Sequence, residues 1–253
     1  MKSFKEQPIN ILVPISGLGL RFKEIGFDIP KPLIPVLGRL MIEWGVASCD
    51  FRNQLTNYKL IFTVRQEHVK DYQIDQVLKK IFGDSIVIIS IDTDHWPKGQ
   101  AGHCLAAKDY INNENRLFIY SCDTYSLSPI WDMIETEDPD GILPCFKSTE
   151  NRFSYARLDD GDYVCETAEK RPISDLATNG HYYFRHGLDF VRAIESMIKN
   201  EEKFNDEYYV APSYNFLIKE GKKIRVVMVT NNWVMGTPIE LEYFLKNYPK
   251  PQS

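Results

Sequence analysis

The sequence lacks long apolar runs: none of its segments approaches the roughly 18 to 20 apolar residues that a membrane-spanning helix needs. No positively charged leader followed by an apolar stretch opens it. Its net charge of -5 gives no general attraction to nucleic-acid phosphates or to anionic membrane surfaces. We therefore expect a cytoplasmic protein with no nucleic-acid or membrane partner, in which any recognition of phosphate is local.

The sequence also lacks the residue spacings of zinc and redox centres. Its 5 cysteines are widely spaced without a CxxC pair, and its 5 histidines form no HExxH motif. We expect the cysteines to be reduced and mostly buried. His181 and His186 are expected to flank a strand instead of binding a metal.

The first half of the sequence alternates between two patterns. Apolar runs typical of buried strands occur at residues 9–15, 58–64, 85–91 and 117–122. Helical periodicity occurs at residues 40–49, 67–82 and 100–111. The alternation predicts an α/β fold with a Rossmann-like, mostly parallel (mixed) sheet sandwiched by helices. Because ligands of such sheets bind beyond the carboxyl ends of the strands, the loops after residues 15, 91 and 122 should face one cleft.

The second half is richer in strands. They are expected at 140–146, 153–159, 162–168, 180–186 and 222–229, with a hairpin turn at 159–162. Helices are expected at about 187–200, at about 208–220 and from Pro238 to Asn247. No Pro/Gly-rich boundary divides the chain. We expect residues 1–253 to form a single domain in which a strand-rich part, about 140–185, shapes a pocket and residues 248–253 are a flexible tail.

The stretch PISGLGLRFKEIGFDIPKPLIPV, residues 14–36, directly follows the first predicted strand. Its glycines allow backbone N–H groups to approach a phosphate closely. A dinucleotide loop of the form GxGxxG is excluded because Phe22 stands where the third glycine belongs, and no GxxxxGK[ST] motif is present. Arg21 and Lys31 could neutralise a triphosphate, and the prolines on both sides of Lys31 predict an extended backbone there.

This stretch resembles the signature of the sugar-phosphate nucleotidyltransferase family, GxGTR followed by PKPL. Further matches follow in the order of the family: PKGQAGHCLAA (97–107), LFIYSCDTY (117–125), ETAEKRP (166–172), TNGHYYF (178–184) and GTPIELEYF (236–244). The resemblance implies in-line attack by an acceptor phosphate on the α-phosphorus of a nucleoside triphosphate, assisted by Mg²⁺, with release of pyrophosphate. Positioning and charge neutralisation would be the work of the protein.

The resemblance also implies roles for particular residues. Arg21 would hold the leaving phosphates, Lys31 would contact the α-phosphate and the acceptor phosphate, and Asp123 would bind the metal. The nucleotide would lie against Pro14, Ile15, Gly17, Leu18, Gly19, Gly99 and Gln100. The acceptor would be surrounded by Glu169, Lys170, Asn179 and Gly180, in the strand-rich part.

The sequence departs from the family pattern at three positions. Leu20 replaces the threonine of GxGTR, and Cys122 replaces the glycine before the metal-binding aspartate. Val234 stands where a second aspartate often precedes the final Gly-Thr-Pro. Water, substrate phosphates or another carboxylate would then complete the metal shell, which suits Mg²⁺ because this ion keeps several waters. Loss of catalysis, leaving a nucleotide-sensing protein, is the alternative.

Within the family the sequence looks most like the CTP-using branch of capsule and surface-polysaccharide clusters. This resemblance implies CTP as the nucleotide and phosphoglutamine as the acceptor, used in capsular phosphoramidate biosynthesis. Side chains of suitable charge for an amino-acid acceptor are Arg152, Arg157, Arg171 and Glu166. The alternative is a sugar 1-phosphate acceptor with CTP, UTP or dTTP. The sequence gives no indication of the oligomeric state.

Overall fold

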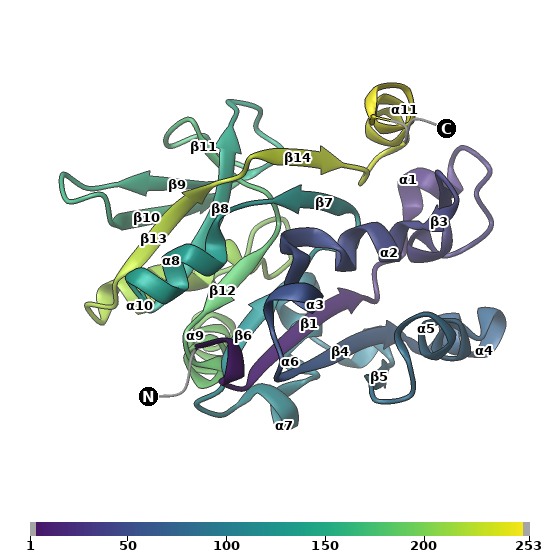
Figure 1. Ribbon diagram of the computed structural model, residues 1–253, viewed down its shortest axis with the longest axis horizontal. Helices are drawn as coiled ribbons and strands as arrows, with labels where there is room; N and C mark the ends of the chain where they lie inside the picture. The colour runs from purple at the N-terminus through teal and green to yellow at the C-terminus, as the bar shows by residue number, and fades with distance from the viewer. Residues whose placement is uncertain (1–3, 250–253) are drawn as a thin grey trace.

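The computed structural model describes residues 4–249, and its centre is a mixed sheet with the strand order β10-β9-β11-β8-β12-β6-β1-β4-β5 (Figure 1). The parallel half is formed by β1 (Ile9–Ile15), β4 (Tyr58–Arg65), β5 (Val87–Ile91) and β6 (Arg116–Ile119). These strands confirm the four apolar runs predicted in the first half. Consecutive β1 residues alternate between the two faces, since Ile11 and Val13 pack in one core and Leu12 packs in the other.

Short helices connect these strands. They are α1 (Leu20–Lys23), α2 (Met41–Val46), α3 (Phe51–Gln54), α4 (Gln66–Tyr72), α5 (Ile74–Phe82), α6 (Gln100–Leu105) and α7 (Lys108–Ile111). The 3₁₀ turns are η1 (Phe4–Glu6), η2 (Lys31–Leu33), η3 (Ser48–Asp50) and η4 (Thr93–His95). The helix predicted over 67–82 is divided in two because Gln73 has a left-handed φ of 50°. Lys31 opens η2, so the extended backbone predicted there is wrong: the N–H groups of Leu33 and Ile34 bond back to the carbonyls of Pro30 and Lys31.

The antiparallel half contains β8 (Gly141–Lys147), β9 (Ser154–Leu158), β10 (Val164–Glu169), β11 (Leu176–Thr178) and β12 (Tyr182–Phe184). Strand β12 pairs antiparallel with both β6 and β8 and so joins the two halves, while β13 (Ile224–Met228) pairs parallel with β8. Helices α8 (Ile130–Thr136), α9 (Gly187–Lys199) and α10 (Tyr214–Lys219), with the turn η5 (Ala211–Ser213), complete this half. The helix predicted at 208–220 therefore begins later than expected.

Two short strand pairs and the last helix lie outside this sheet. Strand β7 (Thr124–Leu127) pairs with β14 (Asn231–Val234), and β2 (Pro35–Val36) pairs with β3 (Arg39–Leu40). Helix α11 (Pro238–Asn247) has the predicted bounds and shares a core with residues of α1 and α2 (Figure 1). Of the predicted tail, residues 250–253 lie outside the described residues, whereas the ring of Tyr248 packs 4.9 Å from that of Trp44.

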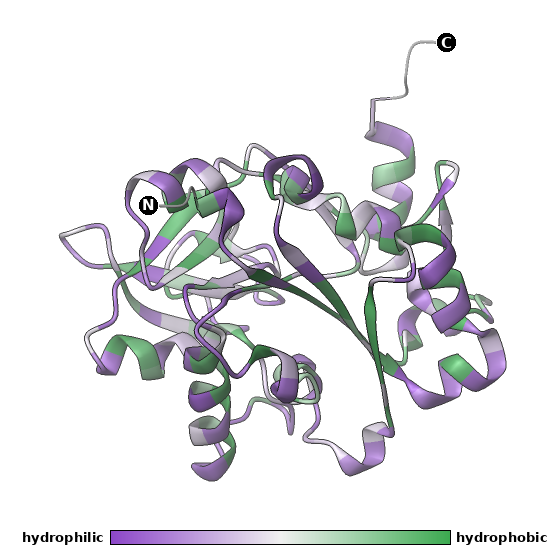
Figure 2. Cartoon of the chain, turned by 60° about the horizontal axis from the view of Figure 1, so that its bottom comes forward, coloured by the Kyte–Doolittle hydropathy of each residue, from purple (hydrophilic) through white to green (hydrophobic). Residues whose placement is uncertain are grey.

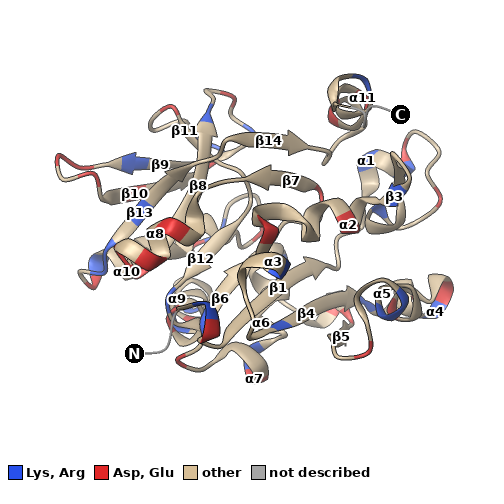
Figure 3. Ribbon diagram, viewed as in Figure 1, with Lys and Arg blue, Asp and Glu red and all other residues tan. Residues whose placement is uncertain are grey.

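Helices cover both faces of the sheet and make three layers. One core joins the sheet to residues of α2, α3, α5 and α8, and the other joins it to residues of α6, α7, α9 and α10. Figure 2 shows the green, apolar strands inside and helices with purple outer surfaces. No helix within residues 4–249 is long and apolar enough to cross a membrane. In Figure 3 basic and acidic residues are interspersed over the face in view, without a basic stripe.

Candidate active site

A cavity of about 790 Å³ opens beyond the carboxyl ends of β1, β4, β5 and β6. The loops after residues 15, 91 and 122 all contribute to its wall, as the strand pattern predicted. Every residue that the sequence assigned to the nucleotide, to catalysis or to the metal lines this one cavity: Pro14, Ile15, Gly17, Leu18, Gly19, Arg21, Lys31, Gly99, Gln100 and Asp123. Segments more than a hundred positions apart are therefore brought together around one space.

Gly19 shapes the start of the loop. Its φ of 64° lies in the left-handed region, and its carbonyl accepts the N–H groups of Phe22 and Lys23 at the beginning of α1. A Cβ atom at this position would lie 3.3 Å from the Cβ of Lys31. Glycine thus allows the loop to turn while Lys31 packs closely against it, which places Arg21 and Lys31 on the same wall.

Lys31 and Asp123 form the central ion pair of the cavity. The Nζ of Lys31 donates to Oδ2 of Asp123 at 2.5 Å, and the hydroxyl of Ser121 donates to Oδ1 at 2.5 Å. Burial alone would lower the pKa of Lys31, but the Asp123 carboxylate outweighs it and raises that pKa. Burial likewise opposes ionisation of Asp123, yet Lys31 and Ser121 hold its pKa below the ordinary value. Both groups are therefore charged at neutral pH.

Arg21 differs from Lys31 in having no ion-pair partner within residues 4–249. Its side chain is exposed along the cavity wall, and its charge acts on Lys31, where it opposes the rise in pKa. Two cations that repel each other across a cavity favour an anion between them. The wall near α1 is accordingly suited to several phosphate groups.

The donor set fits the Mg²⁺ ion that the family resemblance implies. Among residues 4–249 no three side chains of the metal-ligating types cluster, so a metal would have few protein ligands. Asp123 supplies an ionised carboxylate whose side chain is only 15% exposed, beside cations that suit phosphates. One or two carboxylates completed by phosphate oxygens and waters is the environment that Mg²⁺ usually occupies in phosphoryl-transfer sites.

The residues predicted around the acceptor separate into two groups. Glu169 lines a second cavity of about 320 Å³, which shares Glu207 and Tyr209 with the first. Lys170 reaches this shared wall, because its Nζ donates to the Tyr209 hydroxyl at 2.7 Å and the same hydroxyl donates to Glu207 at 2.5 Å. The two cavities therefore meet at one hydrogen-bonded chain of side chains.

Asn179 and Gly180 line neither cavity, in contrast to their predicted position. The amide of Asn179 is buried: it donates to the Ser126 hydroxyl at 2.8 Å and accepts the N–H of His181 at 3.1 Å. Gly180 packs against Ser121, beside Asp123. These two residues support the loop that carries Asp123 and do not face the cavity.

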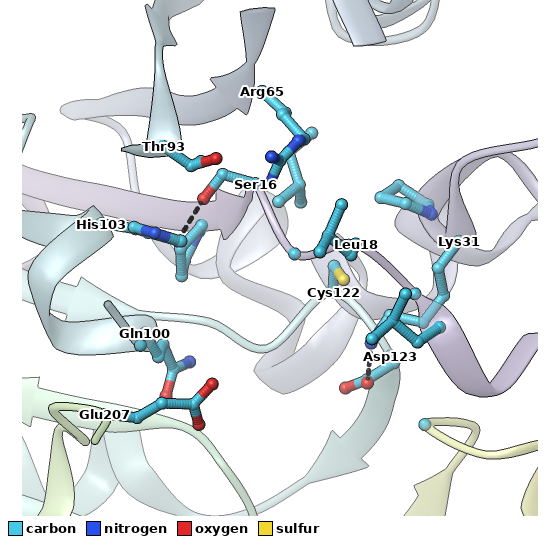
Figure 4. Close-up of a pocket in the computed structure, with 18 of the residues that line it drawn as sticks. Ser16, Leu18, Lys31, Arg65, Thr93, Gln100, His103, Cys122, Asp123 and Glu207 are labelled. Carbon is cyan, nitrogen blue, oxygen red and sulfur yellow. Dashed lines mark hydrogen bonds and ion pairs between the residues drawn. The ribbon is translucent and has the colours of Figure 1, made fainter. Parts of the chain in front are cut away.

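Several cavity residues were not found from the sequence: Arg65, Thr93, His103, Glu207 and Tyr209. Arg65 ends β4, so the rule that ligands bind at carboxyl strand ends could have indicated it. Figure 4 shows Thr93, Ser16, Arg65 and His103 around one end of the cavity and Lys31 and Asp123 at the other. Glu207 and Tyr209 lie in an irregular segment that has no local sequence signal.

Glu169 predicts a pH dependence of stability. Its carboxylate is 8% exposed and accepts the Ser154 hydroxyl, and burial raises its pKa to about 7. The folded state thus holds this proton more tightly than the unfolded state, so stability present below about pH 4.5 is lost as the pH rises through about 7. Between pH 5 and pH 8 we expect the free energy of unfolding, measured with urea, to fall by about 1 to 3 kcal/mol more in the wild type than in Glu169→Gln. The prediction is contradicted if the free energy of unfolding changes with pH equally in the wild type and in Glu169→Gln. The control is Glu202→Gln, at an exposed glutamate.

The chain is similar to known proteins over most of its length. Residues 12–234 match the family described as nucleotidyl transferase. The chain is 22% identical over 237 residues to the D-glycero-alpha-D-manno-heptose 1-phosphate guanylyltransferase of Campylobacter jejuni, which covers 93% of this chain and 98% of that protein. It is 23% identical over 184 residues to the probable glucose-1-phosphate cytidylyltransferase of Bacillus subtilis. This match covers 66% of this chain and 70% of that protein.

A solved structure confirms the fold class. The nucleoside-diphosphate-sugar pyrophosphorylase from Vibrio cholerae RC9 superimposes with a TM-score of 0.78 at 24% identity, covering 94% of this chain and 100% of that one. The family match extends from β1 to β14 and contains the glycine loop, Arg21, Lys31 and Asp123. The chain belongs to the nucleotidyl transferase family and is an enzyme of the nucleotidyltransferase class, EC 2.7.7.

Proposed function

We propose that the enzyme transfers CMP from CTP to a small phosphorylated acceptor and releases pyrophosphate. The observation that carries this proposal is the assembly of Gly19, Arg21, Lys31 and Asp123 around one cavity. An oxygen of the acceptor phosphate attacks the α-phosphorus, the bond to the bridging oxygen breaks, and that oxygen leaves with the β- and γ-phosphates. The bond formed joins two phosphates, and no covalent intermediate with the protein is needed.

The cavity residues stabilise the charge that moves during this step. Arg21, which has no carboxylate partner among the described residues, binds the leaving pyrophosphate. Lys31, held by Asp123 at 2.5 Å, lies where it can meet the α-phosphate and the attacking phosphate. Asp123 would hold Mg²⁺, which when bound supplies further positive charge to phosphate oxygens.

The other end of the cavity supports a cytosine base. The Thr93 hydroxyl is buried without a hydrogen-bond partner. The Nε of Arg65 pairs with Glu67 at 3.1 Å, which leaves the terminal nitrogens of its guanidinium available. Cytosine presents two neighbouring acceptors, O2 and N3, to a guanidinium, whereas uracil carries a hydrogen on N3 that opposes one donor. The Ser16 hydroxyl lies 2.7 Å from Nδ1 of His103, whose pKa burial lowers, so this histidine is neutral at pH 7.

Arg65→Lys is therefore expected to reduce discrimination between CTP and UTP. A lysine keeps the charge but loses the planar pair of donors that distinguishes the two pyrimidine edges. We expect the ratio of kcat/KM for CTP to kcat/KM for UTP to fall about tenfold or more, because kcat/KM for CTP decreases. Lys98→Arg, at another cation of the same wall, is the control. An unchanged ratio in Arg65→Lys would remove this residue from base recognition.

The second cavity supports an acceptor that bears both charges of an amino acid, and phosphoglutamine is our leading proposal, for a role in capsular phosphoramidate synthesis. Its wall carries both charges, with the cations Arg171 and Lys203 among carboxylates such as Glu169. Arg171 donates to Glu166 at 2.8 Å, and Glu166 also pairs with Arg157 at 2.6 Å. Of the charged residues suggested by the sequence, Arg171 alone lines this cavity, whereas Arg152 pairs with Glu150 and Glu240.

A sugar 1-phosphate is the second candidate acceptor. It is favoured by the names of the Bacillus subtilis and Campylobacter jejuni relatives, which are a glucose-1-phosphate and a heptose 1-phosphate enzyme. Carboxylates such as Glu169 and Glu207 are also suitable acceptors for sugar hydroxyl groups.

A matrix of substrates tests both parts of the proposal. Pyrophosphate release is followed with CTP, UTP, dTTP, GTP and ATP, each combined with phosphoglutamine, glucose 1-phosphate or a heptose 1-phosphate. We expect the greatest rate with CTP and phosphoglutamine. Turnover with a sugar 1-phosphate but not with phosphoglutamine would overturn the leading acceptor, and preference for another nucleotide would overturn the cytidylyl assignment.

A further inference from the structure

Gly236, on the wall of the cavity, lies beside two carboxylates. The N–H of Met235 donates to the carbonyl of Asp123 at 2.7 Å, and Val234 pairs with Thr124, so the end of β14 is fixed beside Asp123. The next residue is Gly236, which lines the cavity. A Cβ atom built on Gly236 would lie 2.9 Å from Oδ2 of Asp123 and 3.4 Å from Oε2 of Glu240. The absent side chain leaves a space that faces one oxygen of each carboxylate.

We propose that Glu240 supplies the second carboxylate of the magnesium site, in place of the aspartate that Val234 replaces. The distances from the Gly236 position limit the separation of the two oxygens to about 6.3 Å, the sum of 2.9 and 3.4 Å. A rotation of the Glu240 side chain that moves Oε2 by about 3 Å or less would bring the pair to the spacing of two ligands of one ion, which binds each oxygen at about 2.1 Å. The inference rests on the proposed function, because that reaction is what requires the metal.

The fold holds Glu240 for such a role. It lies in the first turn of α11, where its N–H bonds to the Thr237 hydroxyl at 3.3 Å. Its side chain is 13% exposed, and Oε1 accepts a hydrogen bond from Arg152. Arg152 therefore holds one oxygen, whereas Oε2 has no hydrogen-bond donor or ion-pair partner within the described part of the chain.

Lys31 makes the arrangement compatible with a metal. It pairs with Oδ2 of Asp123, the oxygen that also faces Glu240. An ammonium at this place keeps Asp123 ionised and offsets the repulsion between the two carboxylates before substrate binds. When phosphates enter, Lys31 has a second anion to contact, so Asp123 would hold the ion more tightly than it does without nucleotide.

Manganese binding tests the inference without reliance on turnover. Mn²⁺, which has a similar preference for oxygen ligands, is titrated into wild type, Glu240→Gln and Arg152→Gln, with and without CTP, and free Mn²⁺ is measured by electron paramagnetic resonance. The control is Glu242→Gln, an exposed glutamate of the same helix that pairs with Lys246 at 2.7 Å. Thermal unfolding of each variant verifies that it is folded.

We expect Glu240→Gln to weaken Mn²⁺ binding about tenfold or more and Arg152→Gln to weaken it less, with Glu242→Gln close to wild type. Adding Val234→Asp to Glu240→Gln should restore binding, because it returns a carboxylate beside Asp123 from β14. Wild-type affinity in Glu240→Gln, or an equal loss in Arg152→Gln, would show that Glu240 serves only to anchor α11. Absence of CTP binding by the wild type would instead overturn the proposed function, and the titration without nucleotide still reports on Glu240.

Discussion

Replacing Lys31 by methionine is expected to lower kcat about 10²- to 10³-fold, the usual effect of losing one charge-stabilising donor from an active site. The ammonium of Lys31 is held by Asp123 at 2.5 Å in a cavity shared with Arg21. Methionine has a similar length and no charge, so the cavity keeps its shape while the transition state loses a cation. Steady-state kinetics with CTP at saturation would show the loss in kcat and a smaller change in KM.

Lys23→Met is the matched control, since Lys23 is an exposed lysine in the last turn of α1 that does not line the cavity. The Lys31 variant should also lose stability, because Asp123 is left as a buried carboxylate without its cation. Adding Asp123→Asn removes the unpaired charge and should recover part of that stability without recovering turnover. A Lys31→Met enzyme with kcat within threefold of wild type would show that this lysine is structural.

Gly99→Ala is expected to destabilise the protein strongly. Gly99 has φ 96° and ψ 169°, a conformation essentially restricted to glycine, and a Cβ there would lie 2.5 Å from the carbonyl oxygen of Tyr208. That oxygen accepts the N–H of Ala101 at 3.0 Å, and the N–H of Tyr208 donates to Lys98. The added methyl group must therefore separate residues 98–101 from the segment carrying Glu207 and Tyr209. We expect a loss of about 3 kcal/mol or more in the free energy of unfolding, measured with urea.

The chain provides a closely matched control in Gly83→Ala. Gly83 follows α5 with φ 93° and ψ 167°, yet nothing lies within 4 Å of a Cβ built on it. It therefore carries the same backbone strain, about 1 to 3 kcal/mol, without the collision. The difference between the two variants measures the contact between residues 98–101 and Tyr208. Equal losses would mean that strain alone accounts for the effect and that the two segments move independently.

Much of the site could be predicted because its parts depend on local sequence. A buried strand such as β1 is recognised from its continuous apolar run, and the loop after it from glycines that permit a left-handed turn. Pro238 at the first turn and Thr237 before it mark the start of α11, which has its predicted bounds. These features require only neighbours within a few positions.

The features that were missed depend on partners far along the chain. Strands β7 and β14 are too short to show a pattern, and each exists because the other, about a hundred positions away, supplies its hydrogen bonds. The polar side chain of Asn179 is of a type that could bind an acceptor, but its hydrogen bond to Ser126 directs the amide into the protein. No local pattern determines which way such a side chain faces.

The sequence by itself determined the α/β sheet and predicted which glycines, cations and carboxylate gather beyond the ends of its strands. Only the tertiary structure decided that Lys31 pairs with Asp123, 92 positions away, and that Glu240 faces the same space across Gly236. The physical reason is that apolar periodicity and glycine conformation act within one segment. Ion pairs and metal sites instead depend on distances of a few ångströms between segments, which packing alone sets.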